Sequence, residues 1–366
     1  MGEPLRVGVV GVGKISRAYL TTLDRLPQVR VTMLADLIPE RAQAGLQHAP
    51  AARAAPASEL LGSRDVDLVL NLTIPSAHAQ IALAALAAGK HVYGEKPLAL
   101  DLASGREVLA ARTAGLRVGC APDTVLGTGT QTARRAIADG LIGTPVAANA
   151  AFTTAGHEFW HSDPEFYYQP GGGPLFDMGP YYLSALVHML GPVQRVTGAA
   201  SQARSERVIG SGPRAGTSFP VEVDTHVTGI LEHVSGVLTT ITTSFDVVAS
   251  AQPRIEIHGT EGSLASPDPN TFGGDVLISR PGEREWSPLP VSAGYRNAAR
   301  GIGVADLAEA LSAGRPHRAS AELALHVLDV MQTLLESARA GQTLPVSTPC
   351  PVPDPVPLSE LGVLPA

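Results

Sequence analysis

The stretch Leu5-Arg-Val-Gly-Val-Val-Gly11-Val-Gly13-Lys-Ile-Ser16 joins a short β-branched run to a glycine-rich turn. Its first six residues, LRVGVV, predict a buried strand, and Ile15–Leu26 has the apolar spacing of a helix. Glycines in a strand-to-helix turn let the backbone approach a pyrophosphate, which the helix N-terminus then stabilises. The stretch therefore predicts a dinucleotide-binding unit, although an ordinary strand-to-helix connection also contains such glycines.

The next strand ends at a carboxylate. Val29–Ala35 predicts this strand, and Asp36 follows it, where a dinucleotide-binding unit places an acid on the adenosine ribose. The charge of Asp36 would repel a 2′-phosphate, so we predict NAD as the cofactor. NADP is the alternative, with Arg41 as its nearest contact. Asp36 could instead cap a helix that begins near Pro39.

Beyond this unit, strands and helices alternate over the first 120 or so residues. Parallel strands need helical crossovers, so the alternation predicts a doubly wound parallel sheet. The further strands are expected at Val66–Leu70, His91–Tyr93 and Leu116–Gly119, and the helices at Glu40–Gln47, Ala77–Ala88 and Leu102–Ala114.

The pattern changes after a helix predicted at Thr124–Gly140. Period-two runs separated by Gly and Pro predict a mostly antiparallel sheet. We therefore expect an α/β protein with a Rossmann domain at 1–123, an α+β domain with a large open sheet at 124–342, and a Pro-rich arm at 343–366 that either packs or stays mobile. The expected strands are Pro145–Thr153, Val193–Ser201, Val223–Glu232, Gly236–Ser244, Arg254–His258 and Asp275–Ser279, and the helices are Leu175–Leu190, Gly303–Ala313 and Ala319–Ala340.

Composition narrows the class of partner. The chain has 366 residues, 44% hydrophobic and 17% charged, with a net charge of −7 and no basic stretch interleaved with aromatics, so no nucleic-acid partner is expected. No apolar run approaches the ~20 residues of a membrane span. The two cysteines match no metal spacing, and no secretory segment precedes the first strand, so we expect a cytoplasmic protein that binds small molecules.

Two later strand ends carry candidate chemistry, because ligands of such sheets bind at the carboxyl ends of the strands. Thr73, Pro75 and His78 follow the third predicted strand, where they would face the nicotinamide. Glu95 and Lys96 follow the fourth. A lysine there could exchange a proton with a substrate hydroxyl, particularly if burial lowers its pKa. The simpler alternative is a surface lysine paired with Glu95.

A polar face marks the helix at Leu175–Leu190. Asp177, Tyr181, Ser184 and His188 fall on one side of this helix, and the stripe contains no Lys, Glu or Arg. This composition favours a pocket over a solvated side.

The segment just upstream combines aromatic and hydrogen-bonding side chains. His157, Trp160 and His161 suit a polyol, because aromatic faces stack on sugar rings and imidazoles bind hydroxyls. A zinc site on the two histidines is the lesser alternative, because no third ligand is fixed, and we predict no metal.

With these residues placed, the chain resembles the Gfo/Idh/MocA oxidoreductase family over residues 5–340. The resemblance rests on Gly11-x-Gly13, Asp36, Glu95-Lys96-Pro97, and Gly171-Gly-Gly followed by Asp177-x-Gly179. It implies NAD or NADP in a Rossmann domain, a second domain whose open sheet forms a dimer or tetramer interface, and hydride transfer at a carbon of a sugar, cyclitol or related diol.

The chain departs from the commoner family pattern at two positions. Tyr181 stands where many members have His, as in the branch that includes glucose-fructose oxidoreductase, xylose dehydrogenase and dihydrodiol dehydrogenase, and Ser184 stands where they have Asp. Tyr181 is therefore expected as a proton donor or acceptor whose pKa Lys96 lowers, with Asp177 orienting the pair or binding substrate. The lost acid argues against an inositol-dehydrogenase type of site, and His188 matches only a core histidine.

These observations predict an NAD(P)-dependent dehydrogenase or reductase acting on a sugar or sugar derivative, as a homodimer or homotetramer. Two alternatives remain: a redox-cycling glycosidase or lyase with tightly bound NAD, and a non-catalytic regulator that binds NAD and sugar. The predicted catalytic residues are Lys96, Tyr181 and Asp177; the cofactor residues are Gly11, Gly13, Lys14, Ile15, Asp36, Thr73, Pro75, His78, Glu95 and Lys96; the substrate residues are His157, Trp160, His161, Asp177 and Tyr181.

Overall fold

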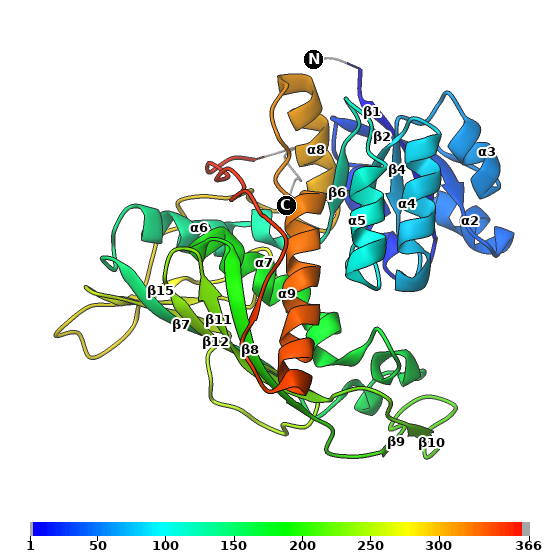
Figure 1. Ribbon diagram of the computed structural model, residues 1–366. Coiled ribbons are helices and arrows are strands. Elements are labelled where there is room, and N and C mark those ends of the chain that lie inside the picture. Colours follow the sequence, from blue (N-terminus) through cyan, green and yellow to red (C-terminus); the bar gives the residue numbers. More distant parts are fainter. Residues whose placement is uncertain (1–2, 361–366) are drawn as a thin grey trace.

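The computed structural model describes residues 3–360 and begins with a parallel sheet (Figure 1). The six strands described there have the order β3-β2-β1-β4-β5-β6, which confirms the doubly wound prediction. The two-residue β3 was missed, because so short a strand carries no periodicity. The strands are β1 (Leu5–Val10), β2 (Val29–Ala35), β3 (Arg53–Ala54), β4 (Leu68–Asn71), β5 (His91–Gly94) and β6 (Val118–Cys120).

Helices bury both faces of this sheet. Val7 and Val9 of β1 pack on the side of α1, while Val10 packs on the side of α3, α4 and α5. Alternate residues of one strand thus serve two cores, which explains its continuous apolar run. The helix predicted from Ile15 ends at Leu23 because Pro27 lies just beyond it. The helices are α1 (Ser16–Leu23), α2 (Pro39–Gly45), α3 (Ala57–Gly62), α4 (His78–Ala87) and α5 (Leu102–Ala110).

The second sheet has, within residues 3–360, nine strands in the order β16-β15-β14-β13-β7-β12-β11-β8-β17. All neighbours are antiparallel except β7 and β12, so the expected mostly antiparallel sheet is confirmed. Its strands are β7 (Pro145–Thr153), β8 (Val193–Ser201), β11 (His226–His233), β12 (Leu238–Ser244), β13 (Ile255–Gly259), β14 (Ser263–Ser266), β15 (Leu277–Ser279), β16 (Ser287–Pro288) and β17 (Leu344–Pro345).

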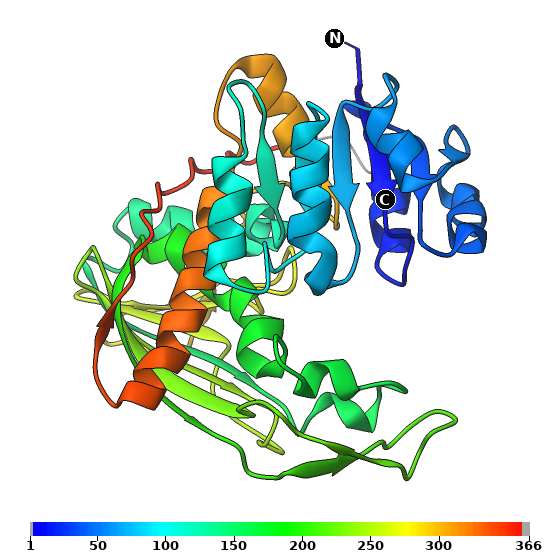
Figure 2. The ribbon, with the colours of Figure 1, turned by 45° about the vertical axis from the view of Figure 1, so that its right-hand side comes forward.

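Helices cover one face of this second sheet. α7 (Gly173–Leu190) packs on β7, β11 and β12, and α9 (Ala321–Ala340) packs on β8 (Figure 2). α6 (Thr128–Ala138) lies between α7 and β14 and starts later than predicted, because Gly127 is extended. A separate hairpin of β9 (Glu206–Val208) and β10 (Ser218–Pro220) lies apart from the large sheet in Figure 1.

The chain returns to the first sheet near its end. α8 (Ile302–Ala313) contacts α1, β2 and β6, although it follows strands β7 to β16 in sequence. The Pro-rich arm then packs in extended form as far as residue 360: β17 pairs with β8, and the amides of Ser347 and Thr348 donate to Asp329. Residues 361–366 of the predicted arm lie outside the described residues. No described helix has both the length and the apolar character needed to cross a membrane.

Candidate active site

The glycine-rich turn leaves room for a ligand on one side. Gly11 has φ +94°, and a Cβ there would lie 2.7 Å from the backbone of Leu72, so the close approach of β1 and β4 requires glycine. A Cβ on Gly13, in contrast, would meet nothing within 4 Å. Lys14 and Ile15 follow, and the Ser16 hydroxyl donates to the Gly13 carbonyl at 2.7 Å. The open turn before α1 fits a pyrophosphate.

Asp36 lies beside this turn at the end of β2. One carboxylate oxygen accepts from the Val12 amide at 2.7 Å, and the other accepts from the Ile38 amide at 2.9 Å. Asp36 does not cap α2, whose first position has no side-chain partner. Leu37 is fully exposed and Ile38 is 43% exposed. These apolar neighbours, which the sequence analysis missed, suit the adenine ring.

His78 holds two strand-end loops together. Its Nδ1 lies 2.6 Å from the Pro97 carbonyl oxygen and its Nε2 lies 3.0 Å from that of Thr73. The imidazole is 2% exposed, so this geometry favours a positioning role for His78. Within the first of these loops, Pro75 begins a single 3₁₀ turn, and Ile74 before it is 68% exposed.

Glu95 and Lys96 point to different partners. Glu95 accepts from the Tyr19 hydroxyl at 2.7 Å and from the Lys96 backbone amide at 3.0 Å. The Lys96 ammonium instead donates to the Asp177 carboxylate at 3.0 Å and to the Asp177 carbonyl at 2.5 Å. The alternative of a surface lysine paired with Glu95 is therefore wrong.

Asp177 is the centre of a cluster that joins the two sheets. Its second carboxylate oxygen lies 2.9 Å from His157 Nε2, and the Lys96 ammonium lies 5.3 Å from the centre of the Tyr181 ring. β5 brings Lys96 to this point, α7 brings Asp177 and Tyr181, and the loop before α7 brings His157. The structure thus brings together the three predicted catalytic residues, two of which are also predicted substrate residues, and the further substrate residue His157.

The charges of this cluster differ from two expectations. Burial opposes the charged form of Lys96, but the charges of Asp177, of Tyr181 where it is ionised, and of Glu95 outweigh it and raise the Lys96 pKa above its ordinary value. Burial also raises the pKa of Tyr181, and nearby Lys96 does not overcome this effect. Lys96 lowers the Tyr181 pKa as expected, but burial outweighs it and the net shift of the phenol is upward. Burial likewise acts to lower the Lys96 pKa, as considered above, but the carboxylates reverse the net direction.

Asp177 remains an anion in this setting. Burial works against its charged form, but Lys96 and His157 together lower the Asp177 pKa to about 2. At neutral pH the cluster therefore contains a lysine cation held by a carboxylate, next to a neutral phenol.

The second half of the polar face on α7 belongs to the core. Ser184 and His188 are each 2% exposed. The His188 ring lies 3.4 Å from the Gln131 amide, and burial lowers the pKa of His188 to about 3. His188 is thus a neutral core histidine, which confirms the expectation for that position.

The predicted substrate loop presents exposed aromatic rings. His157 lies 5.2 Å from Trp160, and Trp160 lies 5.3 Å from His161, measured between ring centres. Trp160 is 60% exposed, and Phe159 and Phe166, which the sequence analysis missed, are exposed by 59% and 54%. Burial and the charge of Lys14 both lower the pKa of His161, which places this loop near the glycine-rich turn.

A buried ion-pair network anchors this loop. Arg207, from the β9–β10 hairpin, donates to Glu158 at 2.6 Å and pairs with Asp246. The Tyr168 hydroxyl donates to Glu158 and accepts from the His157 amide at 3.2 Å. Sequence reasoning missed Arg207 because nothing local links a hairpin residue to a distant loop.

The two histidines considered for zinc have other partners. His157 Nε2 faces Asp177, and His161 Nδ1 accepts from the Asp163 amide at 3.1 Å. No three His, Cys, Asp or Glu side chains among residues 3–360 form a group that could hold a metal ion.

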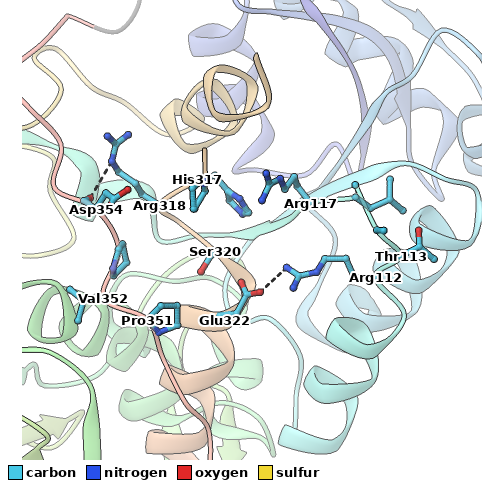
Figure 3. A pocket seen from close by; sticks show the side chains of 15 residues that line it. Arg112, Thr113, Arg117, His317, Arg318, Ser320, Glu322, Pro351, Val352 and Asp354 are labelled. Carbon is cyan, nitrogen blue, oxygen red and sulfur yellow. Dashed lines mark hydrogen bonds and ion pairs between the residues drawn. The ribbon is translucent and has the colours of Figure 1, made fainter. Parts of the chain in front are cut away.

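A separate cavity of about 780 Å³ lies between the α5–β6 connection, the segment before α9 and the Pro-rich arm. Figure 3 shows Arg112 facing Glu322 across it, at 2.7 Å, and Arg318 facing the backbone of Asp354. The α5–β6 connection enters β6 at its amino end, whereas Lys96 follows the carboxyl end of β5, so this cavity is not part of the candidate active site.

Family comparisons agree with this arrangement. Residues 5–120 match the oxidoreductase family with an NAD-binding Rossmann fold, and residues 130–265 match the GFO/IDH/MocA C-terminal domain. The chain belongs to the Gfo/Idh/MocA family and is an oxidoreductase with an NAD-binding domain.

Among curated relatives, 1,5-anhydro-D-fructose reductase of Ensifer adhaerens is 29% identical over 75% of this chain and 78% of its own. Trans-1,2-dihydrobenzene-1,2-diol dehydrogenase of Bos taurus is 29% identical over 82% and 85%. Among solved structures, an NAD-binding oxidoreductase from Klebsiella pneumoniae has a TM-score of 0.82 at 24% identity over 94% of this chain and all of its own. Levoglucosan dehydrogenase with NADH and L-sorbose has a TM-score of 0.81 at 20% identity, over 95% of this chain and all of its own, and both structures support the fold.

Proposed function

We propose that this protein transfers hydride between a nicotinamide and a hydroxyl-bearing carbon of a sugar or sugar derivative. The observation that carries the proposal is the Lys96–Asp177–Tyr181 cluster, which lies at the carboxyl end of β5 in a sheet whose first turn fits a dinucleotide. One curated relative named above reduces anhydrofructose, and the other is a dehydrogenase of a dihydrodiol. Both names support a substrate with adjacent oxygen functions.

Tyr181 is the group proposed to move the proton. Among the described residues its hydroxyl makes no hydrogen bond, so it is free to contact a substrate oxygen. In reduction the neutral phenol donates its proton to the oxygen of the new alcohol, and in oxidation the phenolate accepts the hydroxyl proton. The bound nicotinamide supplies or accepts the hydride. Lys96, a cation held by Asp177, stabilises negative charge on either oxygen.

The cofactor proposal rests on the open face of the turn at Gly11 and Gly13 and on the carboxylate of Asp36 beside it. Lys14 and Ile15 would flank the pyrophosphate, while Thr73, Pro75 and Glu95 would border the nicotinamide half. Asp36 favours NAD over NADP, because a 2′-phosphate would approach a carboxylate.

Substrate binding is assigned to the loop before α7. His157 and Asp177 offer polar groups, and the exposed ring of Trp160 with the half-buried ring of His161 suits the apolar face of a sugar ring. The open face of the second sheet supports the predicted homodimer or homotetramer, since cross-strand register places exposed Ile230 and Leu238 on it among threonines. A cytoplasmic location remains a prediction.

The test is absorbance of reduced nicotinamide during incubation with NAD or NADP and a panel of aldoses, cyclitols and glycosides, with product analysis. We expect the signal to grow with a sugar, and Lys96→Ala to lower kcat by about 100- to 10,000-fold. Lys90→Ala, which removes a lysine bonded to the carbonyls of Ser63 and Val66, is the matched control. Glycoside cleavage without net signal would support the redox-cycling alternative, and silence in both would support a regulator.

A further inference from the structure

The segment before α8 brings a second cation to Tyr181. The guanidinium carbon of Arg300 lies 5.5 Å from the centre of the Tyr181 ring, and the Lys96 ammonium lies 5.3 Å from the same centre. The two cations come from different parts of the chain: Lys96 follows β5 and Arg300 precedes α8. The sequence around Arg300 contains no motif that would have indicated this placement.

The backbone next to Arg300 is firmly fixed. The amides of Gly301 and Gly303 donate to one carboxylate oxygen of Asp123, at 2.8 and 3.1 Å. Gly301 has φ +107°, a conformation that favours glycine, so the chain turns sharply into α8 at this point. The side chain is fixed as well, because its Nη2 donates to the side-chain oxygen Oδ1 of Asn270 at 2.8 Å.

The guanidinium is only partly used by these structural contacts. Within residues 3–360, its buried Nη1 has no hydrogen-bond partner. An arginine that served only to tie segments together would be expected to satisfy its buried donors, since an unsatisfied one is costly. Arg300 therefore keeps a donor and a positive charge beside the phenol.

The groups facing Tyr181 have opposing effects on the pKa of its hydroxyl. Burial raises the Tyr181 pKa, the cations Lys96 and Arg300 lower it, and the carboxylates Glu95 and Asp177 raise it. The neighbouring Tyr167 is a neutral phenol at physiological pH, because burial raises its pKa to about 12. Arg300 remains charged, because the phenol and carboxyl groups around it outweigh its burial and raise its pKa.

We propose that Arg300 is a positioning residue for proton transfer, which acts with Lys96 to place positive potential at the Tyr181 hydroxyl. This inference deepens the proposed function, because it takes Tyr181 as the proton-transfer group. It gives the loop before α8 a role in the reaction, although that loop lies outside the sequence motifs around Lys96 and Asp177 from which the site was predicted.

The first test needs no substrate. Tyrosinate absorbance is titrated in Arg300→Gln, Arg300→Lys and wild type, and the titration of the matching Tyr181→Phe protein is subtracted from each. An opposite charge within about 4–6 Å shifts an acid's pKa by roughly 1–3. We expect the Tyr181 midpoint to rise by about 1 in Arg300→Gln and to stay near wild type in Arg300→Lys. Arg296→Gln, which removes an exposed arginine of the same loop, is the control.

The second test uses the substrate found by the nicotinamide assay. Arg300→Gln should lower kcat for oxidation about tenfold at neutral pH and move the alkaline rise of kcat upward, with KM for the dinucleotide changed less than about threefold. If Arg300→Gln does not fold, Asn270→Ala should give a smaller upward shift of the Tyr181 midpoint, because it frees the guanidinium.

An unmoved Tyr181 midpoint in folded Arg300→Gln would overturn the inference, and so would an Arg300→Lys protein as strongly shifted as Arg300→Gln. These outcomes are distinct from failure of the proposed function, which would show as wild-type turnover that survives both Lys96→Ala and Tyr181→Phe. The titration reports on Arg300 in either case.

Discussion

At the scale of single residues, the protonation states in the site depend on whether burial or the neighbouring charges have the larger effect. Lys96 is buried, and burial alone would favour its neutral form, but the carboxylate of Asp177 at 3.0 Å outweighs that effect. Lys96 therefore acts through its charge, whereas Tyr181 carries the exchangeable proton. The sequence located both residues, but the direction of their pKa shifts needed the depth and the neighbours that only the fold defines.

Asp36 decides the choice of dinucleotide at this scale. Its carboxylate accepts from the Val12 amide and lies beside the open turn, so removing the charge should weaken NAD and admit NADP. Asp36→Asn keeps an acceptor for Val12. We expect KM for NAD to rise about tenfold, because one hydrogen bond between a charged carboxylate and the ribose is weakened. KM for NADP should fall. Equal changes for both dinucleotides, measured by initial rates, would contradict the assignment.

At the scale of elements, Asp123 couples the start of α8 to pH. Burial raises its pKa from 3.8 to about 6, so the folded protein favours the protonated form more than the unfolded chain does. The stability that this preference contributes is present below about pH 4 and is lost as pH rises through 6. Asp123→Asn stays neutral at both pH values. Its melting temperature relative to wild type should therefore improve from pH 4.5 to pH 7.5, and an unchanged difference would argue against the shift.

Arg207 tests whether the hairpin of β9 and β10 supports the substrate loop. Arg207→Met leaves Glu158 and Asp246 buried without their partner, which should cost about 3–5 kcal/mol of unfolding free energy. KM for the sugar should rise more than KM for NAD, since Glu158 and Tyr168 fix His157. Arg214→Ala, which removes exposed ion pairs from the same hairpin to Asp163 and Glu165 in the segment before α7, should stay close to wild type because solvent screens them. Denaturant unfolding and initial rates measure both effects.

Elements also show where sequence patterns lose their information. The long strands β2, β7 and β8 were predicted with their observed ends, because their periodicity is long enough to recognise. The strands β11 and β12 were predicted to start too early, because the turn residues before them continue the alternation. The two- and three-residue strands β3, β9 and β17 were missed, because pairing with a neighbour and not local pattern defines them. Arg207 and Arg300 were missed for the same reason: their partners come from distant segments.

At the scale of the whole molecule, the helices of residues 3–360 leave one face of the second sheet uncovered. Register pairs Ile230 with Thr240 and Leu238 with Ala147, and Ile230 and Leu238 are exposed by 46% and 51%. The face also carries Thr197 opposite Ile230 and the ion pair of Arg195 with Glu232 beside Leu238, and an exposed sheet surface of this kind suits a second copy of the same sheet.

Ile230→Glu tests this assembly. A stable interface must bury about 1,000 Å² or more, and a new carboxylate at Ile230, next to Glu232 on the same face, would be desolvated and would approach its own copy across a two-fold axis. Light scattering on a sizing column should then give the mass of one chain, against two or four for wild type.

Val208→Glu is the matched control, because Val208 is 51% exposed but lies on the hairpin apart from the sheet. A wild-type mass for Ile230→Glu, or a single-chain mass for the unmodified protein, would contradict assembly through this face. If Ile230→Glu gives single chains that still turn over, the active site is complete within one chain, as expected from the intrachain contacts of Lys96, Asp177 and Tyr181.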